Sequence, residues 1–284
     1  KNILLYIALI LFSITYLSLI VFYLVLPFTL KYYILGSDFT AFLSGAHVLI
    51  SRNISEFTQL SHHQESFTHL TGIVNKSVLV IRNAPIATLF FVPLLSLPLI
   101  TGFTIIYTIN IALIGSLGLI ITKILNLNWK YAFLIYLYFP SVTTLGQGQF
   151  SALIGIIIFT GILSHQKGYA YISGTILGLL SIKLQFLLII PYILLTTQNN
   201  KIKFILGLIT TTIIFWGITS IIFGINIIPD YLQMLVKTEQ PINGSRPAEM
   251  FTLYGLLMPI FEKLSINKNY VYIINLIGYL ISLH

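Results

Sequence analysis

The chain has 284 residues, of which 57% are hydrophobic and only 8% carry a charge. Soluble domains carry about 25% charged residues, so this composition excludes a water-soluble fold and indicates a protein surrounded by lipid. The formal net charge of +8 comes largely from Lys and Arg beside apolar runs, as in membrane anchors, so no nucleic-acid partner is expected. Cysteine is absent, which excludes disulfides, thiolate metal sites and a cysteine nucleophile.

A series of apolar runs predicts an all-α fold, a polytopic transmembrane helical bundle. A bilayer core of about 30 Å needs roughly 20 helical residues. Three runs clearly reach that length, at 3–30, 100–122 and 203–224. Shorter runs lie at 84–98, 131–145, 150–164, 168–182, 185–198, 250–261 and 270–283. We expect 1–284 to form a single transmembrane domain that is incomplete at its C-terminus, because the last run stops at His284.

The lysines predict the orientation of the helices, since short cytoplasmic loops are rich in Lys and Arg. By this rule the cytoplasmic loops carry Lys123, Lys130, Lys167, Lys201, Lys203, Lys263 and Lys268. The segments at 146–149, around Lys183 and at 225–249 then face outward. We expect the membrane to be a bacterial plasma membrane. The loop 31–83 lies on the outer side only if 84–98, which contains three prolines, is a half-crossing or a surface element.

The long external loop 31–83 is expected to carry surface helices. Apolar residues in 39–51 recur at helical spacing and predict an amphipathic helix along the membrane surface. Asp38, one of two aspartates in the chain, stands just before this helix. Its carboxylate is a candidate general base if the surroundings tune its pKa, and the alternative is that it only caps the helix.

Two polar sites interrupt the apolar runs downstream. Lys183 lies inside an apolar stretch and is followed closely by Gln185. A cation there is costly, so it either serves a substrate or extends to an interface. The segment LGQGQFS brings in the amides of Gln147 and Gln149, which suit sugar hydroxyls or phosphate. The alternative for this segment is a simple glycine-rich turn between helices.

Two arginines are candidate anion ligands, and a histidine cluster is not a candidate metal site. Arg82 precedes the start of the 84–98 run, where it either binds phosphate at a helix N-terminus or anchors the interface. Arg246 lies in the external segment NGSRPAEM and is either an anion ligand or a solvated charge. His62, His63 and His69 lack an acid-rich pattern such as HExxH, so we expect a solvated, partly helical loop and no metal.

Four motifs, taken in order, resemble those of glycosyltransferase family 87, the polyprenyl-phosphate-mannose-dependent mannosyltransferases of the GT-C superfamily. The resemblance covers roughly 36–195. The motifs are GSDFTAFLSGAHVLI at 36–50, NAPIATLFFVPLLSLPL at 83–99, GQGQFSALIGIII at 146–158 and GTILGLLSIKLQFLLIIPYILL at 174–195. The chain departs from the family pattern at Ala84-Pro85, where a double proline is usual, and at Leu184, where a proline often follows the lysine.

The resemblance implies an inverting transfer of a hexose, with mannose the implied sugar. The donor would be a polyprenyl-phosphate sugar entering from the bilayer, and the acceptor a hydroxyl of a lipid or glycan at the outer face. Asp38 would be the general base, while Lys183, Arg82 and Arg246 would stabilise the leaving phosphate. Gln149 would position the sugar or the phosphate. Membrane lipids are the expected surroundings, and no cofactor or catalytic metal is implied.

Two other classes of membrane protein remain open at this point. A lipid or sugar transporter or flippase would explain an intramembrane cation such as Lys183, although the internal repeats common in transporters are not evident. A membrane scaffold or assembly subunit would need no chemical role for Asp38.

Overall fold

The protein is seen in a computed structural model whose regular elements are all helices in the part of the chain that it describes. The described residues are 37–52, 54–74, 81–196, 200–238 and a few residues between 10 and 25. The predicted all-α class is therefore confirmed. The predicted run at 3–30 is described only at scattered helical residues, and the runs at 250–261 and 270–283 lie outside the described residues.

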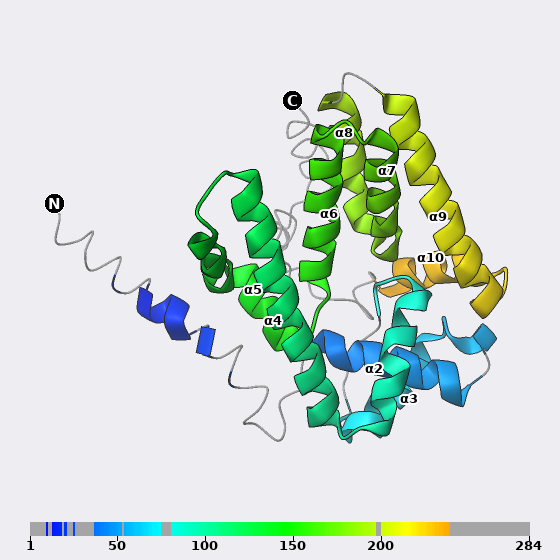
Figure 1. Ribbon diagram of the computed structural model, residues 1–284. Coiled ribbons are helices and arrows are strands. Elements are labelled where there is room, and N and C mark those ends of the chain that lie inside the picture. Colours follow the sequence, from blue (N-terminus) through cyan, green and yellow to red (C-terminus); the bar gives the residue numbers. More distant parts are fainter. Residues whose placement is uncertain are drawn as a thin grey trace, which may run out of the picture.

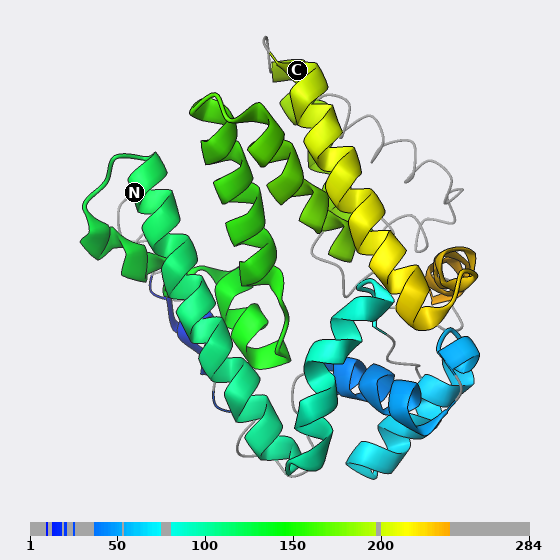
Figure 2. The same ribbon diagram turned by 45° about the vertical axis from the view of Figure 1, so that its right-hand side comes forward.

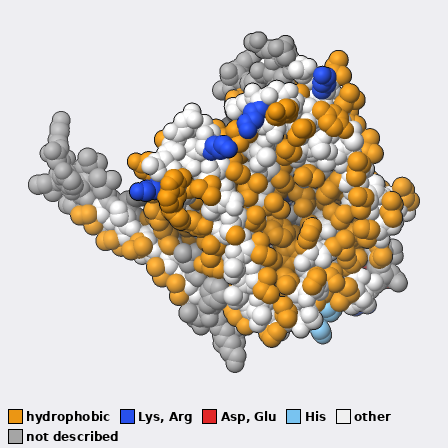
Figure 3. All heavy atoms as spheres, viewed as in Figure 1, with side chains coloured by type: hydrophobic (Ala, Val, Ile, Leu, Met, Phe, Trp, Pro, Cys, Tyr) orange, Lys and Arg blue, Asp and Glu red, His pale blue; other side chains and the backbone are white. Residues whose placement is uncertain are grey.

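Two helices are long and apolar enough to cross a bilayer, and both were predicted. They are α4 (Leu99–Ile124) and α9 (Lys201–Phe223), each with a mean hydropathy of 2.0 in its most apolar window. Only 22% and 17% of those windows are buried, whereas a core helix of a soluble protein would be mostly buried. The face shown in Figure 3 is correspondingly apolar over most of its area. These helices and this surface indicate an integral membrane protein.

The upper part of the bundle is built from α6 (Ser151–Gln166), α7 (Ala170–Gly178) and α9, which run side by side (Figure 1, Figure 2). Small residues allow close approach, since a Cβ on Gly207 of α9 would collide with the carbonyl oxygen of Tyr171 on α7. Ser173 Oγ donates to the Gly161 carbonyl at 2.7 Å and joins α7 to α6. Small residues and interhelical hydrogen bonds are the usual means of joining helices in lipid.

Three predicted runs are each divided into two elements. The run 131–145 divides at Tyr138, whose backbone is extended, and Pro140 lies in the first turn of the helix that follows, where its missing N–H needs no partner. The run 168–182 continues beyond α7 as a 3-10 helix, and 185–198 starts with another. The resulting elements are η3 (Trp129–Leu137), α5 (Phe139–Gln147), η4 (Leu179–Ile182), η5 (Leu184–Leu188) and α8 (Ile189–Thr196).

The lower part of the molecule contains segments predicted to be external, together with the 84–98 run and the start of α4 (Figure 2). It contains α2 (Ser37–Ser51), η1 (Ile54–Glu56), α3 (Leu60–Thr71), η2 (Pro85–Ser96) and α10 (Ile227–Thr238). The sequence pattern predicted an amphipathic α2 with one buried face, but every residue from 39 to 46 is buried. The difference arises because α3 and η2 both pack on α2.

The 84–98 run forms η2, a 3-10 helix of 12 residues with Pro93 inside it. It starts beside Ile182, whose carbonyl accepts the backbone N–H of Ala84 at 2.7 Å. From there η2 runs down to the start of α4 and does not approach the upper end of the bundle (Figure 1, Figure 2). A half-crossing of the bilayer remains a prediction, and this short element is compatible with it.

The exposed lysines Lys123, Lys167 and Lys201 lie at one end of the bundle. They stand at the end of α4, between α6 and α7, and at the start of α9, which all lie at the upper end of the molecule (Figure 1). A row of Lys and Arg accordingly borders the apolar face in Figure 3. The α5–α6 turn and α2 lie toward the other end, and the orientation of the bundle in the membrane stays a prediction.

Candidate functional site

Asp38 lies in the first turn of α2 and is partly buried. The prediction that Asp38 precedes the helix as its N-cap is wrong, because α2 already begins at Ser37, one residue earlier. In the first turn a carboxylate is stabilised by the partial positive charge of the helix N-terminus. This position therefore favours an ionised Asp38 side chain.

A cluster of aromatic rings fixes α2 against two other motifs of the sequence. Phe42 stacks on Phe91 of η2 with centroids 4.5 Å apart, and both rings contact Phe150 of the α5–α6 turn at 5.3 Å. Phe39, next to Asp38, packs edge-on against Phe103 of α4 at 5.5 Å. Aromatic pairs in such geometries contribute roughly 0.5–1.5 kcal/mol beyond their buried area. The cluster thereby holds the start of α2 at the α5–α6 turn.

The α5–α6 turn needs glycine at position 148 for two reasons. Gly148 follows the last residue of α5 and has φ +69°, the left-handed conformation that commonly ends a helix. A Cβ there would stand 2.7 Å from Cβ of Phe39. The segment LGQGQFS forms a turn between α5 and α6, and this turn brings Gln149 beside Asp38.

A chain of side-chain hydrogen bonds runs from α6 to Asp38. Ser151 Oγ donates to Oε1 of Gln149 at 2.8 Å, and Nε2 of Gln149 donates to Oε1 of Gln147. The Gln149 side chain also forms a hydrogen bond with the Asp38 carboxylate. Both predicted glutamines therefore lie in one polar network with the predicted base.

Two cations lie close enough to Asp38 to act on its charge. Lys183 separates η4 from η5, and its Nζ stands 5.6 Å from the centroid of the Phe186 ring. Arg82 is held near Lys183 by the backbone hydrogen bond from Ala84 to Ile182. The carbonyl of Arg82 accepts a hydrogen bond from the Tyr231 hydroxyl at 3.0 Å. Both side chains are partly buried. Their location beside a carboxylate differs from that of interfacial anchors, which point to solvent.

These neighbours act on Asp38 in opposite directions. Burial raises the pKa of the Asp38 carboxyl above its ordinary value. The charge of Lys183, the hydrogen bond from Gln149 and the charge of Arg82 each oppose that rise. A carboxylate with a raised pKa is a stronger base, and the two cations keep its ionised form accessible.

Other predicted residues lie elsewhere. Gln185 is exposed on η5, and Arg246 lies outside the described residues. The prediction of a solvated histidine loop is wrong for His63, which is buried on α3 with Nε2 2.7 Å from the Phe57 carbonyl oxygen. His62 lies 3.3 Å from a carboxylate oxygen of Glu56. In the described part of the chain no group of three or more potential ligands is arranged to hold a metal.

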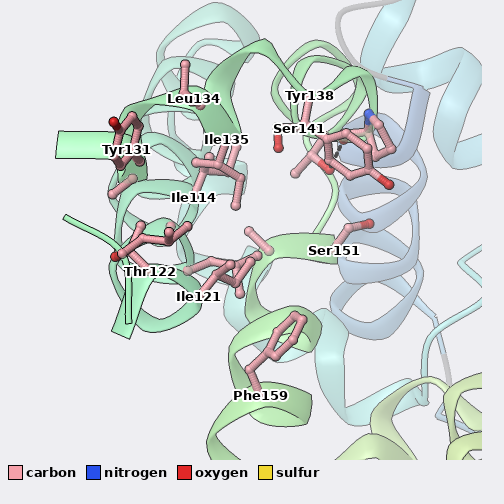
Figure 4. A pocket seen from close by; sticks show the side chains of 17 residues that line it. Ile114, Ile121, Thr122, Tyr131, Leu134, Ile135, Tyr138, Ser141, Ser151 and Phe159 are labelled. Carbon is pink, nitrogen blue, oxygen red and sulfur yellow. Dashed lines mark hydrogen bonds between the residues drawn. The ribbon is translucent and has the colours of Figure 1, made fainter. Parts of the chain in front are cut away.

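An apolar pocket of about 670 Å³ adjoins this polar network, between α4, η3, α5 and α6. Figure 4 shows Ser151 on the opposite side of the view from Tyr131 and Thr122, with Ile114 and Ile121 between them. Pockets of roughly 300–1,000 Å³ suit small molecules or parts of larger ones. Because Ser151 lines the pocket and also contacts Gln149, the pocket and the Asp38 network share a boundary.

Sequence reasoning missed two residues of this region. Ser151 was visible only as part of a turn motif, and its hydroxyl gains significance from its contact with Gln149. Tyr231 is fully buried on α10 and bonds to the Arg82 carbonyl across a wide sequence separation. No local sequence pattern predicts either contact.

Comparison with known proteins identifies the family. The model of glycosyltransferase family 87 matches residues 83–280. No match was found among curated proteins or among solved structures. The motifs that resemble this family span 36–195, whereas the match begins later and also covers the C-terminal third of the chain.

The matched region contains Gln147, Gln149 and Lys183, whereas Asp38 and Arg82 precede it. A glycosyltransferase is an enzyme that moves a sugar from a donor to an acceptor, which argues against the transporter and scaffold alternatives. Because the match extends over well more than half of the chain, this membrane protein belongs to glycosyltransferase family 87.

Proposed function

We propose that the protein transfers a hexose, with mannose the sugar implied by the resemblance, from a polyprenyl-phosphate donor to a hydroxyl of a lipid or glycan acceptor. The observation that supports this most directly is the meeting of Asp38 with Gln149, Lys183 and Arg82. These residues come from four separate segments, and together they supply a base, an amide and two cations. This is the set of groups that a transfer with a phosphate leaving group requires.

In the proposed step, the Asp38 carboxylate removes the proton of the acceptor hydroxyl as its oxygen attacks the anomeric carbon. The bond between that carbon and the phosphate oxygen breaks, and the lipid phosphate leaves with the bonding electrons. A single displacement of this kind inverts the anomeric centre. Lys183 and Arg82 stabilise the charge that develops on the phosphate, and Gln147 and Gln149 orient sugar hydroxyls or phosphate oxygens.

The apolar pocket supports a lipid-linked donor. It is lined mainly by aliphatic and aromatic side chains, and its Ser151 wall is two side-chain hydrogen bonds away from Asp38. The chain of the donor can lie in such a pocket while its phosphate and sugar reach the polar network. Lys123, Lys167 and Lys201 lie at the opposite end of the bundle, so the reaction is proposed to take place on the outer face of the membrane.

The test compares the two aspartates of the chain. Protein in liposomes is given polyprenyl-phosphate mannose, labelled in the sugar, and a membrane lipid extract as acceptor. Asp38→Asn should lower the rate of label transfer by about 10²–10⁴-fold, the usual contribution of a general base. Asp230→Asn is the matched control, because Asp230 is exposed on α10, and it should leave the rate unchanged. Transfer that persists in Asp38→Asn would overturn the proposed role of Asp38.

A further inference from the structure

The Ser151 hydroxyl donates its hydrogen bond to a side chain and not to the backbone of the helix that Ser151 begins. Serine near a helix start commonly satisfies the free backbone N–H groups. Here the N-cap position of α6 is Phe150, and no side chain caps the helix. Ser151 Oγ instead donates to Oε1 of Gln149 at 2.8 Å. The hydroxyl therefore contributes to the polar network and not to helix capping.

The direction of this hydrogen bond selects one orientation of the Gln149 amide. An amide has an accepting oxygen at one end and a donating NH₂ group at the other. The oxygen faces the Ser151 hydroxyl, and Nε2 donates to Gln147 while the side chain is hydrogen-bonded to Asp38. The reversed amide would direct its oxygen at a carboxylate, which is also an acceptor.

We propose that Ser151 is a positioning residue for the transfer, because its hydroxyl holds the Gln149 amide in the orientation that donates to Asp38. This inference rests on the proposed function, in which Asp38 is the general base. Ser151 acts through Gln149 and takes no part in proton transfer itself.

The position of Ser151 on the pocket wall strengthens its role. The pocket is mainly apolar, and another of its hydroxyls, Thr144 Oγ1, already donates to the Pro140 carbonyl at 2.7 Å. When an apolar chain fills the pocket, water is displaced from this wall. The serine hydroxyl then remains as the donor to the Gln149 oxygen.

The charged and polar groups around Asp38 determine the sign of the effect. Lys183 at the η4–η5 junction and Arg82 before η2 both lower its pKa, and so does the hydrogen bond from Gln149. Without the Ser151 hydroxyl the Gln149 amide can turn, so its hydrogen bond to the carboxylate weakens. The pKa of Asp38 then rises, and less of the base is ionised at acidic pH.

The experiment measures kcat/KM for sugar transfer from labelled polyprenyl-phosphate mannose as a function of pH. In Ser151→Ala the acidic limb should move up by about one pH unit, which lowers kcat/KM by up to about tenfold on that limb and little on the plateau. Ser151→Thr keeps the hydroxyl and should restore the original profile. Ser164→Ala removes a hydroxyl elsewhere on α6 and is the matched control.

The possible results separate this inference from the proposed function. An unshifted acidic limb in Ser151→Ala, in a protein that Asp38→Asn inactivates, overturns the positioning role alone. A uniform loss at every pH that Ser151→Thr fails to restore indicates a purely structural serine and also overturns it. Full transfer activity in Asp38→Asn contradicts the proposed function itself. Thermal unfolding of each variant identifies any that fail to fold. If Ser151→Ala fails to fold, Ser151→Gly, which also removes the hydroxyl, replaces it in the comparison with Ser151→Thr.

Discussion

Replacing Gly148 by alanine should destabilise the turn that carries Gln149 through two separate costs. The left-handed backbone, at φ +69°, costs an alanine about 1–2 kcal/mol. The new Cβ would also stand 2.7 Å from Cβ of Phe39 and 3.5 Å from Cε2 of Phe103. Overpacking of this kind typically costs about 1–3 kcal/mol, so the total is roughly 2–5 kcal/mol.

Gly168 provides the control for the backbone cost alone. Its φ is +83°, but a Cβ there would meet no atom within 4 Å. Gly168→Ala should therefore lose about 1–2 kcal/mol, and Gly148→Ala about 1–3 kcal/mol more. Asparagine tolerates the left-handed conformation better than alanine, so Gly148→Asn should recover part of the backbone cost while retaining the Cβ contact.

The assay is thermal unfolding of the purified protein followed by its intrinsic fluorescence, together with sugar transfer. One kcal/mol shifts the midpoint by about 2–4 °C for chains of 150–250 residues, so a difference of several degrees between the two alanine variants is expected. Transfer should fall in Gly148→Ala, because Phe39 adjoins Asp38, and should be retained in Gly168→Ala. Equal losses of stability would refute the contact between the turn and α2.

Two further predictions concern stability. Burial lowers the pKa of His63 to about 4. Since the unfolded chain binds the proton near pH 6.5, stability should fall by up to about 3 kcal/mol as the pH drops from about 6.5 to 4. Unfolding midpoints measured against pH should show this slope and lose it in His63→Gln; a flat parent profile contradicts it. In α9, Gly207→Ala should lower the midpoint by colliding with Tyr171, whereas Gly217→Ala, where a Cβ meets nothing within 4 Å, should gain about 0.5–1 kcal/mol. Shifts of the same sign would contradict the close α7–α9 packing.

The candidate site shows which parts of the structure local sequence can anticipate. Asp38, Lys183 and Gln149 stand out because a charge or an amide is conspicuous beside long apolar runs. Gln185 is equally conspicuous in sequence, yet it is exposed on η5. Residue type and spacing therefore select candidates, but they do not decide which of them face one another.

Composition and run length by themselves determined the membrane environment, the helical class and the long helices α4 and α9. They could do so because lipid leaves the backbone few alternatives to a helix of sufficient length. Only the tertiary structure decided that α2 is buried on nearly all sides, that Gln149 contacts Asp38, and that Ser151 donates to Gln149. Those outcomes depend on close packing between distant segments, at Gly148 and in the aromatic cluster, which no local pattern encodes.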